Sequence, residues 1–356
     1  MLACQLQASE IEPGDLYVTI DNLGYELNTR TKEAHVVSYG SNVPPETTIL
    51  ISPEEVEYNG MTYRVTALLD TGTLYFWKSK IKSLYLPASI TYFGNSAFTQ
   101  ECTLEEIHIT DLSAWCKIDF RSSPTWYARH LFLNGEEIVD LVIPEDVTSI
   151  SQDAFRRLYI KSVTLPEGLE SIGDRTFSQC ENLTTMHFPE SLKSIGYCAF
   201  KSCHGLQSVV FEGNVDTLGE QAFASCSNLT NIIIKGEMGE LKKRQFTGLQ
   251  QIRNVYCYST KPPEANDETF EYSPIESAML HVPEVAIETY RESPGWKAFG
   301  NIVKIEGNPN GIETVQSPES IVHSPNQGIF NLLGRRLHEA PEKGIYIQDG
   351  KKVLVK

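Results

Sequence analysis

Residues 183–206 read LTTMHFPESLKSIGYCAFKSCHGL, and the same pattern recurs through the middle of the chain. Each copy begins at a Leu or Ile, most copies are 23 residues long, and a Phe recurs in step. Repeats of 20–50 residues are typical of solenoids, whose stacked units bury their apolar sides only against their neighbours. The anchors are Ile81, Leu104, Ile138, Ile160, Leu183, Leu206, Leu229 and Ile252, and the phenylalanines are Phe98, Phe155, Phe177, Phe200, Phe223 and Phe246.

One copy indicates how each unit folds. Met186 and Phe188 alternate with polar residues, which predicts a short strand with these two side chains in the core. Pro189 ends the strand because proline has no N–H to donate. Gly196 is expected to allow the following turn, and Phe200 to fill the centre of the coil. The predicted fold is therefore a β-rich solenoid with a 23-residue period, which favours binding over catalysis.

Three cysteines share one position of the repeat: Cys180, Cys203 and Cys226. Stacked strands would place them about 4.8 Å apart, which is close enough for a disulfide bond. However, side chains in register point the same way, and three thiols cannot pair evenly. We therefore expect buried free thiols that pack as small apolar groups. No Cys/His spacing suggests a zinc site, and no cofactor is expected.

The segments that flank the repeat predict two caps. Residues 11–66 alternate as strands and turns, and Asn59-Gly60 favours a hairpin, so this segment is expected to cover the first coil. The coils are assigned to residues 67–277. Residues 278–305 are expected to close the other end, with a strand at 278–283 and a helix at 284–291. The apolar residues expected to cover that end are Trp296, Phe299, Ile302 and Val303.

The two ends of the chain differ from its middle. Residues 306–328 are rich in Pro, Ser, Asn and Gly, which is typical of a linker. Residues 329–356 predict a compact β tail with more basic than acidic residues. Residues 1–10 resemble the last part of a secretory signal but lack its charged leader. A start codon placed too far downstream, a shortened chain, or a lipoprotein-type cleavage at Cys4 would each account for this.

One unit is longer than the others, because Leu104 and Ile138 are 34 residues apart. We assign about 11 additional residues to the stretch 115–130, which holds two of the four tryptophans. Insertions in repeats go to loops, and loops often carry binding residues. Two interpretations stay open: the aromatic residues fill an enlarged coil, or Trp126 and Tyr127 are exposed and contact a glycan.

Strand alternation also identifies the side chains that point away from the core. The middle outward positions of successive strands form a column. The residues of this column become apolar in the later repeats, toward the C-terminal end of the solenoid. Exposed apolar patches often mark contact sites, although Val, Ile and Tyr are also good strand formers. We expect Val210, Ile233 and Tyr256 to contact a protein partner or the tail. The predicted partner-binding residues are Tyr85, His108, His187, Val210, Ile233 and Tyr256, and Val142 and Thr164 complete the column.

Composition excludes several functions. A net charge of −16 argues against nucleic-acid binding, which needs clustered Lys and Arg, and against anionic membranes. No apolar run reaches the 18 residues of a transmembrane helix candidate. The motifs of serine hydrolases, zinc proteases and phosphate-binding loops are absent, and the eight histidines are scattered. We therefore expect a non-enzymatic protein.

Four short motifs occur together at fixed places in the repeat. In this combination residues 60–305 resemble the BspA-like, or Treponema pallidum-type, leucine-rich-repeat proteins of bacterial surfaces. The first coil, at 67–77, departs from the family pattern. The motifs are Leu-Pro or its equivalent (86–87, 143–144, 165–166, 188–189), Ser-Ile-Gly (171–173, 194–196), Ala-Phe (97–98, 154–155, 199–200, 222–223) and Cys-x-x-Leu (180–183, 203–206, 226–229).

The tail is similar to the C-terminal sorting or anchoring domains of exported Bacteroidetes proteins, including type IX secretion cargo. The similarity lies in residues 330–334, 344–346 and 350–353. Together the two resemblances imply a secreted or outer-surface protein that adheres to host matrix, host proteins or other bacteria. The alternative is a glycan-binding accessory protein of a cell-surface nutrient system, for which an exposed Trp126 is the main argument. The sequence names neither the partner nor the oligomeric state.

Overall fold

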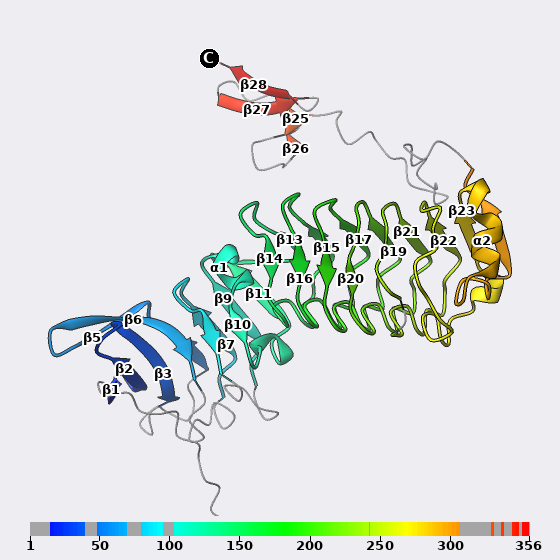
Figure 1. Ribbon diagram of the computed structural model, residues 1–356. Coiled ribbons are helices and arrows are strands. Elements are labelled where there is room, and N and C mark those ends of the chain that lie inside the picture. Colours follow the sequence, from blue (N-terminus) through cyan, green and yellow to red (C-terminus); the bar gives the residue numbers. More distant parts are fainter. Residues whose placement is uncertain are drawn as a thin grey trace, which may run out of the picture. The chain divides into compact units, whose positions relative to one another are not determined.

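The computed structural model divides into two compact units, residues 1–305 and 306–356 (Figure 1). The expected signal remnant at 1–10, with Cys4, lies outside the described residues, as do Phe98 and nearly all of the expected linker. The described residues are 15–39, 48–69, 80–94, 103–241 and 243–306, with four short strands between 329 and 355.

The first unit begins with an antiparallel meander that runs directly into the coils. The hairpin expected at Asn59-Gly60 is present, and the two residues have φ angles of 50° and 72°. Positive angles at both positions match the right-handed twist of the paired strands. The strand after this hairpin pairs in parallel with the meander and with the first coil. The strands of this sheet are β1 (Asp15–Ile20), β2 (Leu23–Asn28), β3 (Glu33–Tyr39), β5 (Glu55–Tyr58), β6 (Met61–Leu68), β8 (Tyr92–Phe93) and β10 (Asp119–Phe120).

The coils that follow each contribute one strand to a long row of mainly parallel strands, which we call the long sheet (Figure 1). Its hydrogen-bonded segments are β4-β7-β9-β11-β12, β13-β15 and β17-β19-β21-β22-β23-β24. Paired residues are mostly 22 to 25 positions apart, as at Thr185, Ser208 and Asn231. The bounds are β4 (Ile49–Ile51), β7 (Ser83–Leu86), β9 (Glu106–Ile109), β11 (His130–Leu133), β12 (Glu136–Glu137), β13 (Asp140–Val142), β15 (Ser162–Thr164), β17 (Thr185–Phe188), β19 (Ser208–Phe211), β21 (Asn231–Ile234), β22 (Asn254–Cys257), β23 (Met279–Val282) and β24 (Asn301–Lys304).

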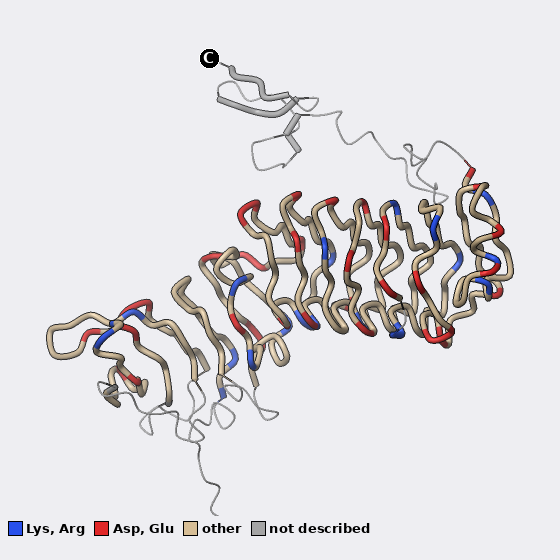
Figure 2. The backbone as a smooth tube through the Cα atoms, viewed as in Figure 1, with Lys and Arg blue, Asp and Glu red and all other residues tan. Residues whose placement is uncertain are grey.

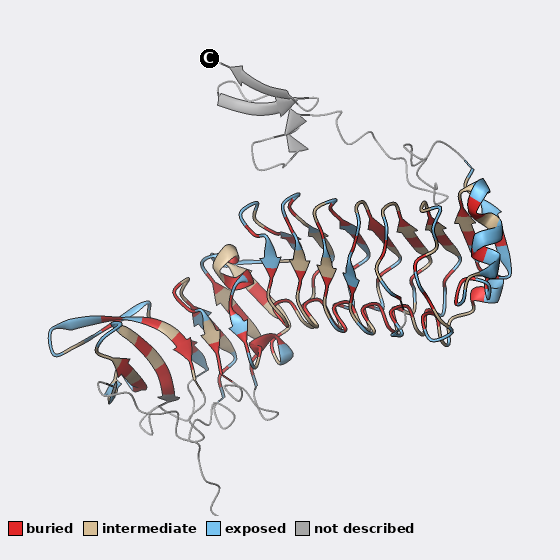
Figure 3. Ribbon diagram, in the orientation of Figure 1, coloured by how far each residue is buried: buried red, intermediate tan, exposed pale blue. Residues whose placement is uncertain are grey.

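A second, shorter sheet runs along the part of each coil that follows the long strand. Its four strands have two residues each and pair in parallel. Together the two sheets enclose a continuous core, and Figure 3 shows buried residues along every coil. The chain is therefore a β-solenoid, as the repeat predicts. The short strands are β14 (Ser149–Ile150), β16 (Ser171–Ile172), β18 (Ser194–Ile195) and β20 (Thr217–Leu218).

Phenylalanine rings stack through the centre of the coils. Adjacent rings from Phe155 to Phe246 have centroids 5.1 to 5.5 Å apart and are nearly parallel. The stack continues to Phe270, 5.6 Å beyond Phe246. Offset stacks of this kind contribute more than their buried area alone. Each ring therefore depends on the coils before and after it.

The cysteines of the repeat lie beside this stack as buried free thiols. Cys180, Cys203 and Cys226 each donate a hydrogen bond to a phenylalanine carbonyl in the preceding coil, at 3.0 to 3.1 Å. Burial raises the pKa of the Cys180 and Cys226 thiols well above the ordinary value of 9.0. These thiols are therefore protonated partners of the backbone.

Gly196 is required for a reason other than the expected one. Its φ is not among the positive values, so the turn does not need the conformational freedom of glycine. Instead, a Cβ at Gly196 would lie 2.5 Å from the amide nitrogen of Asp174 in the preceding coil. The glycine thus permits two backbones to approach closely.

The additional residues of the long unit lie later than expected. His130 pairs with Glu106 in the long sheet, so the stretch assigned to an insertion forms a coil of ordinary length. It contains α1 (Leu112–Cys116) and a short 3₁₀ helix (Pro124–Trp126). The surplus is instead a hairpin, β11–β12, turned by Asn134-Gly135 with positive φ angles. Asn134-Gly135 is therefore a second hairpin turn of the same kind as Asn59-Gly60.

The C-terminal end of the first unit is closed by a short helical segment, with a 3₁₀ helix (Glu284–Ala286) and α2 (Ile287–Glu292) where a helix was expected. Trp296, Phe299 and Ile302 are buried, whereas Val303 lies on the exposed side of β24. A further 3₁₀ helix (Ile275–Ser277) precedes β23. Among the described residues, no helix is both long and apolar enough to cross a membrane. The boundaries at residues 66 and 277 stay predictions.

The second unit contains a four-stranded antiparallel sheet in the order β26-β25-β27-β28. A compact β tail was expected here from the sequence. Its role in sorting or anchoring stays a prediction. The strands are β25 (Ile329–Phe330), β26 (Arg336–Leu337), β27 (Gly344–Gln348) and β28 (Lys351–Val355).

Replacing one ring of the stack tests its role. Phe200→Ala should lower the free energy of unfolding by about 3–5 kcal/mol, because it leaves a cavity between two neighbouring rings. Chemical denaturation monitored by circular dichroism measures this change. Phe132→Ala, on a partly exposed strand position, should cost much less. Similar losses in the two variants would contradict a central role for the stack.

The thiols predict a dependence of stability on pH. Above pH 9 the unfolded chain releases thiol protons that the native Cys180 and Cys226 retain. The free energy of unfolding should therefore fall as pH rises, by up to about 1.4 kcal/mol per pH unit and thiol. The double variant Cys180→Ala/Cys226→Ala should show a shallower decline in denaturation series between pH 8 and 10. An unchanged slope would show that other groups dominate.

Candidate functional site

The long sheet has one side in the core and one side away from it, which we call the outer face. Side chains in register align there into columns. In the middle column Tyr85 pairs with His108, which pairs with Phe132. The same column continues, after the hairpin, from His187 to His281. Within each segment of the long sheet, members that are far apart in the sequence therefore lie side by side.

Three of these residues form a stack, the N-terminal ladder. The ring centroids of Tyr85 and His108 are 4.1 Å apart, and those of His108 and Phe132 are 4.5 Å apart. Nε2 of His108 lies 3.2 Å from a Glu106 carboxylate oxygen, which also accepts a hydrogen bond from Ser83. These hydrogen bonds, that of Ser83 first, lower the pKa of Glu106. The ladder is therefore held in place by a charged group beside it.

A second stack, the C-terminal ladder, consists of Tyr256 and His281, whose ring centroids are 4.2 Å apart. Nε2 of His281 lies 3.2 Å from the Asn254 side-chain oxygen, and Asn254 donates to Asn231 at 3.1 Å. Partial burial raises the pKa of Tyr256. Aromatic rings again lie beside an ordered polar column.

The β11–β12 hairpin opens a cavity beside the N-terminal ladder, with a volume of about 480 Å³. Two contacts fix its wall: His130 Nδ1 lies 2.6 Å from Glu137, and Arg129 donates to the Tyr159 hydroxyl at 3.1 Å. The lining combines aromatic rings with three carboxylates. The lining residues are Leu104, Glu105, Glu106, Tyr127, Arg129, His130, Phe132, Glu137 and Tyr159.

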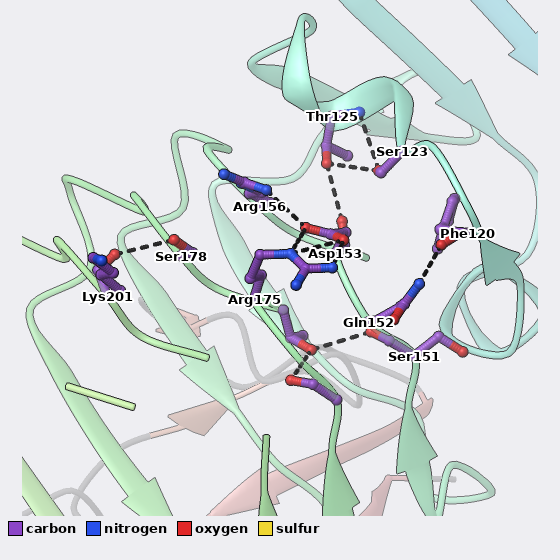
Figure 4. A network of polar contacts seen from close by, with 12 residues as sticks. Phe120, Ser123, Thr125, Ser151, Gln152, Asp153, Arg156, Arg175, Ser178 and Lys201 are labelled. Carbon is purple, nitrogen blue, oxygen red and sulfur yellow. Dashed lines mark hydrogen bonds and ion pairs between the residues drawn. The ribbon is translucent and has the colours of Figure 1, made fainter. Parts of the chain in front are cut away.

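A different polar centre lies at the turns of the coils (Figure 4). Asp153 accepts hydrogen bonds from Arg156 at 3.1 Å and from Arg175 at 2.8 to 3.2 Å. Burial lowers the pKa of Arg156, while the hydrogen bond to Asp153 raises that of Arg175. Thr125, in the 3₁₀ helix, donates to the backbone carbonyl of Asp153. The network thus joins three successive parts of the solenoid.

The predicted loop pair lies beside this centre. Trp126 is 39% exposed, but the Arg156 guanidinium lies over its ring, 3.7 Å from the centroid. Tyr127 is partly buried, packs against the core and lines the cavity of the hairpin. Of the two residues of this pair, Trp126 therefore presents the larger exposed aromatic surface, and part of that surface is already occupied.

The periodic core agrees with the family comparison. Residues 66–121 and 148–276, more than half of the chain, match the family described as BspA type Leucine rich repeat region, in six copies. The chain belongs to this family. The residues between the two matched ranges, 122–147, contain the hairpin. The hairpin is thus an addition to the BspA type repeat at the place where the cavity forms.

Several solved structures are similar to this BspA type chain. A leucine rich cell surface protein from Faecalibacterium prausnitzii is 19% identical, over 82% of this chain and 95% of its own, with a TM-score of 0.34. The pneumococcal vaccine antigen PcpA is 14% identical, over 83% and 100%, with a TM-score of 0.42. A leucine rich repeat protein from T. pallidum is 19% identical, over 67% and 91%, with a TM-score of 0.35. No curated protein matches the chain.

The predicted partner-binding residues of this BspA type protein differ in accessibility. Tyr85 and His187 are exposed, and His108, Ile233 and Tyr256 are partly buried. Val210 is only 3% exposed, so the expected apolar run from Val210 to Tyr256 is not an open patch. Val210 is thus covered by its surroundings although its strand position points away from the core.

Sequence reasoning missed two members of the ladders. Phe132 was not predicted as an outward residue because the insertion was assigned to the wrong stretch. His281 was not predicted because its strand was assigned to the closing segment. Tyr159 reaches the cavity from the neighbouring coil. The Asn134-Gly135 turn signal in the sequence could have revealed the hairpin, and with it Phe132. Among the residues that the structure describes, no group of His, Cys, Asp and Glu could hold a metal ion.

The burial of Val210 leads to a direct test. Val210→Lys should lower the free energy of unfolding by about 2 kcal/mol or more, because it forces a charge into a shielded position. Val142→Lys, in the same column but 61% exposed, should leave stability within about 0.5 kcal/mol. Thermal denaturation of the two variants measures the difference. Equal stability would show that Val210 is accessible after all.

Proposed function

We propose that the chain binds a protein partner through the outer face of its long sheet. The observation that carries this proposal is the pair of aromatic–imidazole ladders, Tyr85–His108–Phe132 and Tyr256–His281. Aromatic side chains with a polar tip dominate the energetics of protein interfaces. Because stacking already restricts these rings, binding costs little additional side-chain entropy.

The cavity of the hairpin supports the same proposal and specifies part of the partner. Glu105, Glu106 and Glu137 line it together with Tyr127, Phe132 and Tyr159. Carboxylates beside aromatic rings suit an Arg or Lys side chain, which gains both ion pairs and cation–π contact. A basic segment of the partner would also be attracted by the net charge of −16.

The tail supports a place of action outside the cell. Its resemblance to sorting and anchoring domains of exported proteins supports a secreted or outer-surface protein. Adhesion to host matrix proteins or to other bacteria is the role that fits a non-enzymatic solenoid with an ordered outer face. The glycan-accessory alternative rested on Trp126, and Arg156 covers part of its ring, which weakens stacking by a neutral sugar.

Binding of the full chain to arrays of host matrix and bacterial surface proteins tests the proposal. Tyr85→Glu and His187→Glu should each weaken a protein interaction at least about tenfold, because they place a charge on the outer face. Val285→Glu is the matched control, since Val285 is 84% exposed in the closing segment, away from the long sheet. Interactions that tolerate both outer-face changes would refute binding through this face.

A further inference from the structure

Charges of both signs follow the turns of the coils (Figure 2). At one turn, two arginines lie against the ring of Trp126. The guanidinium groups of Arg156 and Arg157 lie 3.7 and 5.5 Å from its ring centroid. Arg175 joins them through Asp153, and Arg121 lies at the same opening. This group of positive charges lies in a chain whose net charge is −16.

These arginines line a cavity of about 330 Å³, the basic cavity. Its volume is at the lower end of the range for small-molecule sites. Three arginines but only one carboxylate line it. The lining residues are Arg121, Ser122, Ser123, Trp126, Tyr127, Asp153, Arg156 and Arg175.

The single lining carboxylate orients two of the three arginines without neutralising both. Asp153 binds Nη1 of Arg156, and Nε and Nη2 of Arg175. A guanidinium has five N–H donors, so each arginine keeps donors that Asp153 does not engage. Asp119 pairs with Arg121 at 3.3 Å, but both side chains are about half exposed and the pair is screened by water. The lining therefore keeps a surplus of positive charge.

The neighbouring groups decide what kind of anion fits. Trp126 and Tyr127 add aromatic surface and Ser122 adds a hydroxyl group to the same lining, whereas the Ser123 hydroxyl is engaged by Thr125. An acidic side chain of a protein has one carboxylate and no hydroxyls, and would leave much of this lining unused. A sugar that carries a carboxylate or sulfate offers hydroxyls and an apolar ring edge as well. Both the carboxylate and the sulfate of such a sugar can pair with arginine through two parallel hydrogen bonds.

We propose that the basic cavity binds the carboxylate or sulfate group of an acidic saccharide. Arg121, Arg156 and Arg175 contact the anionic group, and the exposed edge of Trp126 contacts the sugar ring. The site shares none of the ladder residues of the outer face. Tyr127 also lines the cavity of the hairpin, but Arg121, Trp126 and Arg175 do not, so variants of these residues test the basic cavity separately from the proposed protein interaction.

Isothermal titration of the full chain tests this site with four probes: a heparin tetrasaccharide, an oligogalacturonate, a neutral dextran oligosaccharide and poly-L-glutamate. We expect one or both acidic saccharides to bind, dextran not to bind, and poly-L-glutamate to bind more weakly. A preference for heparin identifies sulfate as the group recognised, and a preference for oligogalacturonate identifies carboxylate. Absence of binding by both saccharides, or tighter binding of poly-L-glutamate, overturns the proposal.

Variants locate the binding. Arg121→Gln should weaken binding of the acidic saccharide about tenfold, since one charge-assisted contact is lost. The Arg121 side chain is exposed, so this substitution should not unfold the protein. Trp126→Ala should weaken it as well. Arg244→Gln is the matched control: Arg244 occupies the turn position of Arg175 three coils further on, with φ of 58° against 54°. An equal loss in Arg244→Gln would show that diffuse charge, and not this cavity, attracts the saccharide.

Discussion

The stacking of one phenylalanine ring on the next is the contact on which the first unit depends. From Phe155 to Phe270 each ring is covered by the ring of the following coil. A single coil has no second layer with which to bury its own ring, so stability comes from interfaces between neighbours. This explains why the ends need special residues. Trp296 and Phe299 complete the stack at one end by edge contacts with Phe270.

The regular core also determines what the outer face can do. Because strands pair in register, any residue placed at one outward position lies beside its counterparts from the adjacent coils. Rings at successive positions then stack, as Tyr256 and His281 do, while asparagines at another position form hydrogen bonds. The core leaves these outward positions unconstrained. Recognition can therefore change by surface substitution while the fold stays the same.

Much of the fold could be predicted from the sequence, because the period of 23 residues equals the number of residues in one coil of the solenoid. The strand around Met186 and the buried column with Cys203 follow from alternation and spacing alone. The candidate site was less predictable. Exposure depends on the size of neighbouring side chains, so Val210 points outward and is still shielded.

Features that interrupt the period were harder to predict. Anchor spacing reveals that residues are added but not where, and the hairpin at β11–β12 was therefore placed in the wrong stretch. Both cavities combine residues from several coils, as Tyr127 and Tyr159 do beside the hairpin. Such combinations become visible only when the stacking of the coils is known.

The hairpin adds strands to one side of the solenoid only. On the other side Ser151 donates directly to the carbonyl of Cys116, with no added layer between the two coils. On the side of the hairpin the long sheet is interrupted between β12 and β13, and again between β15 and β17. The two ladders therefore occupy separate segments of it. If both patches bind the proposed partner, the molecule is bivalent. A partner with a repeated epitope could engage both patches at once, and its apparent affinity would then exceed that of either patch alone.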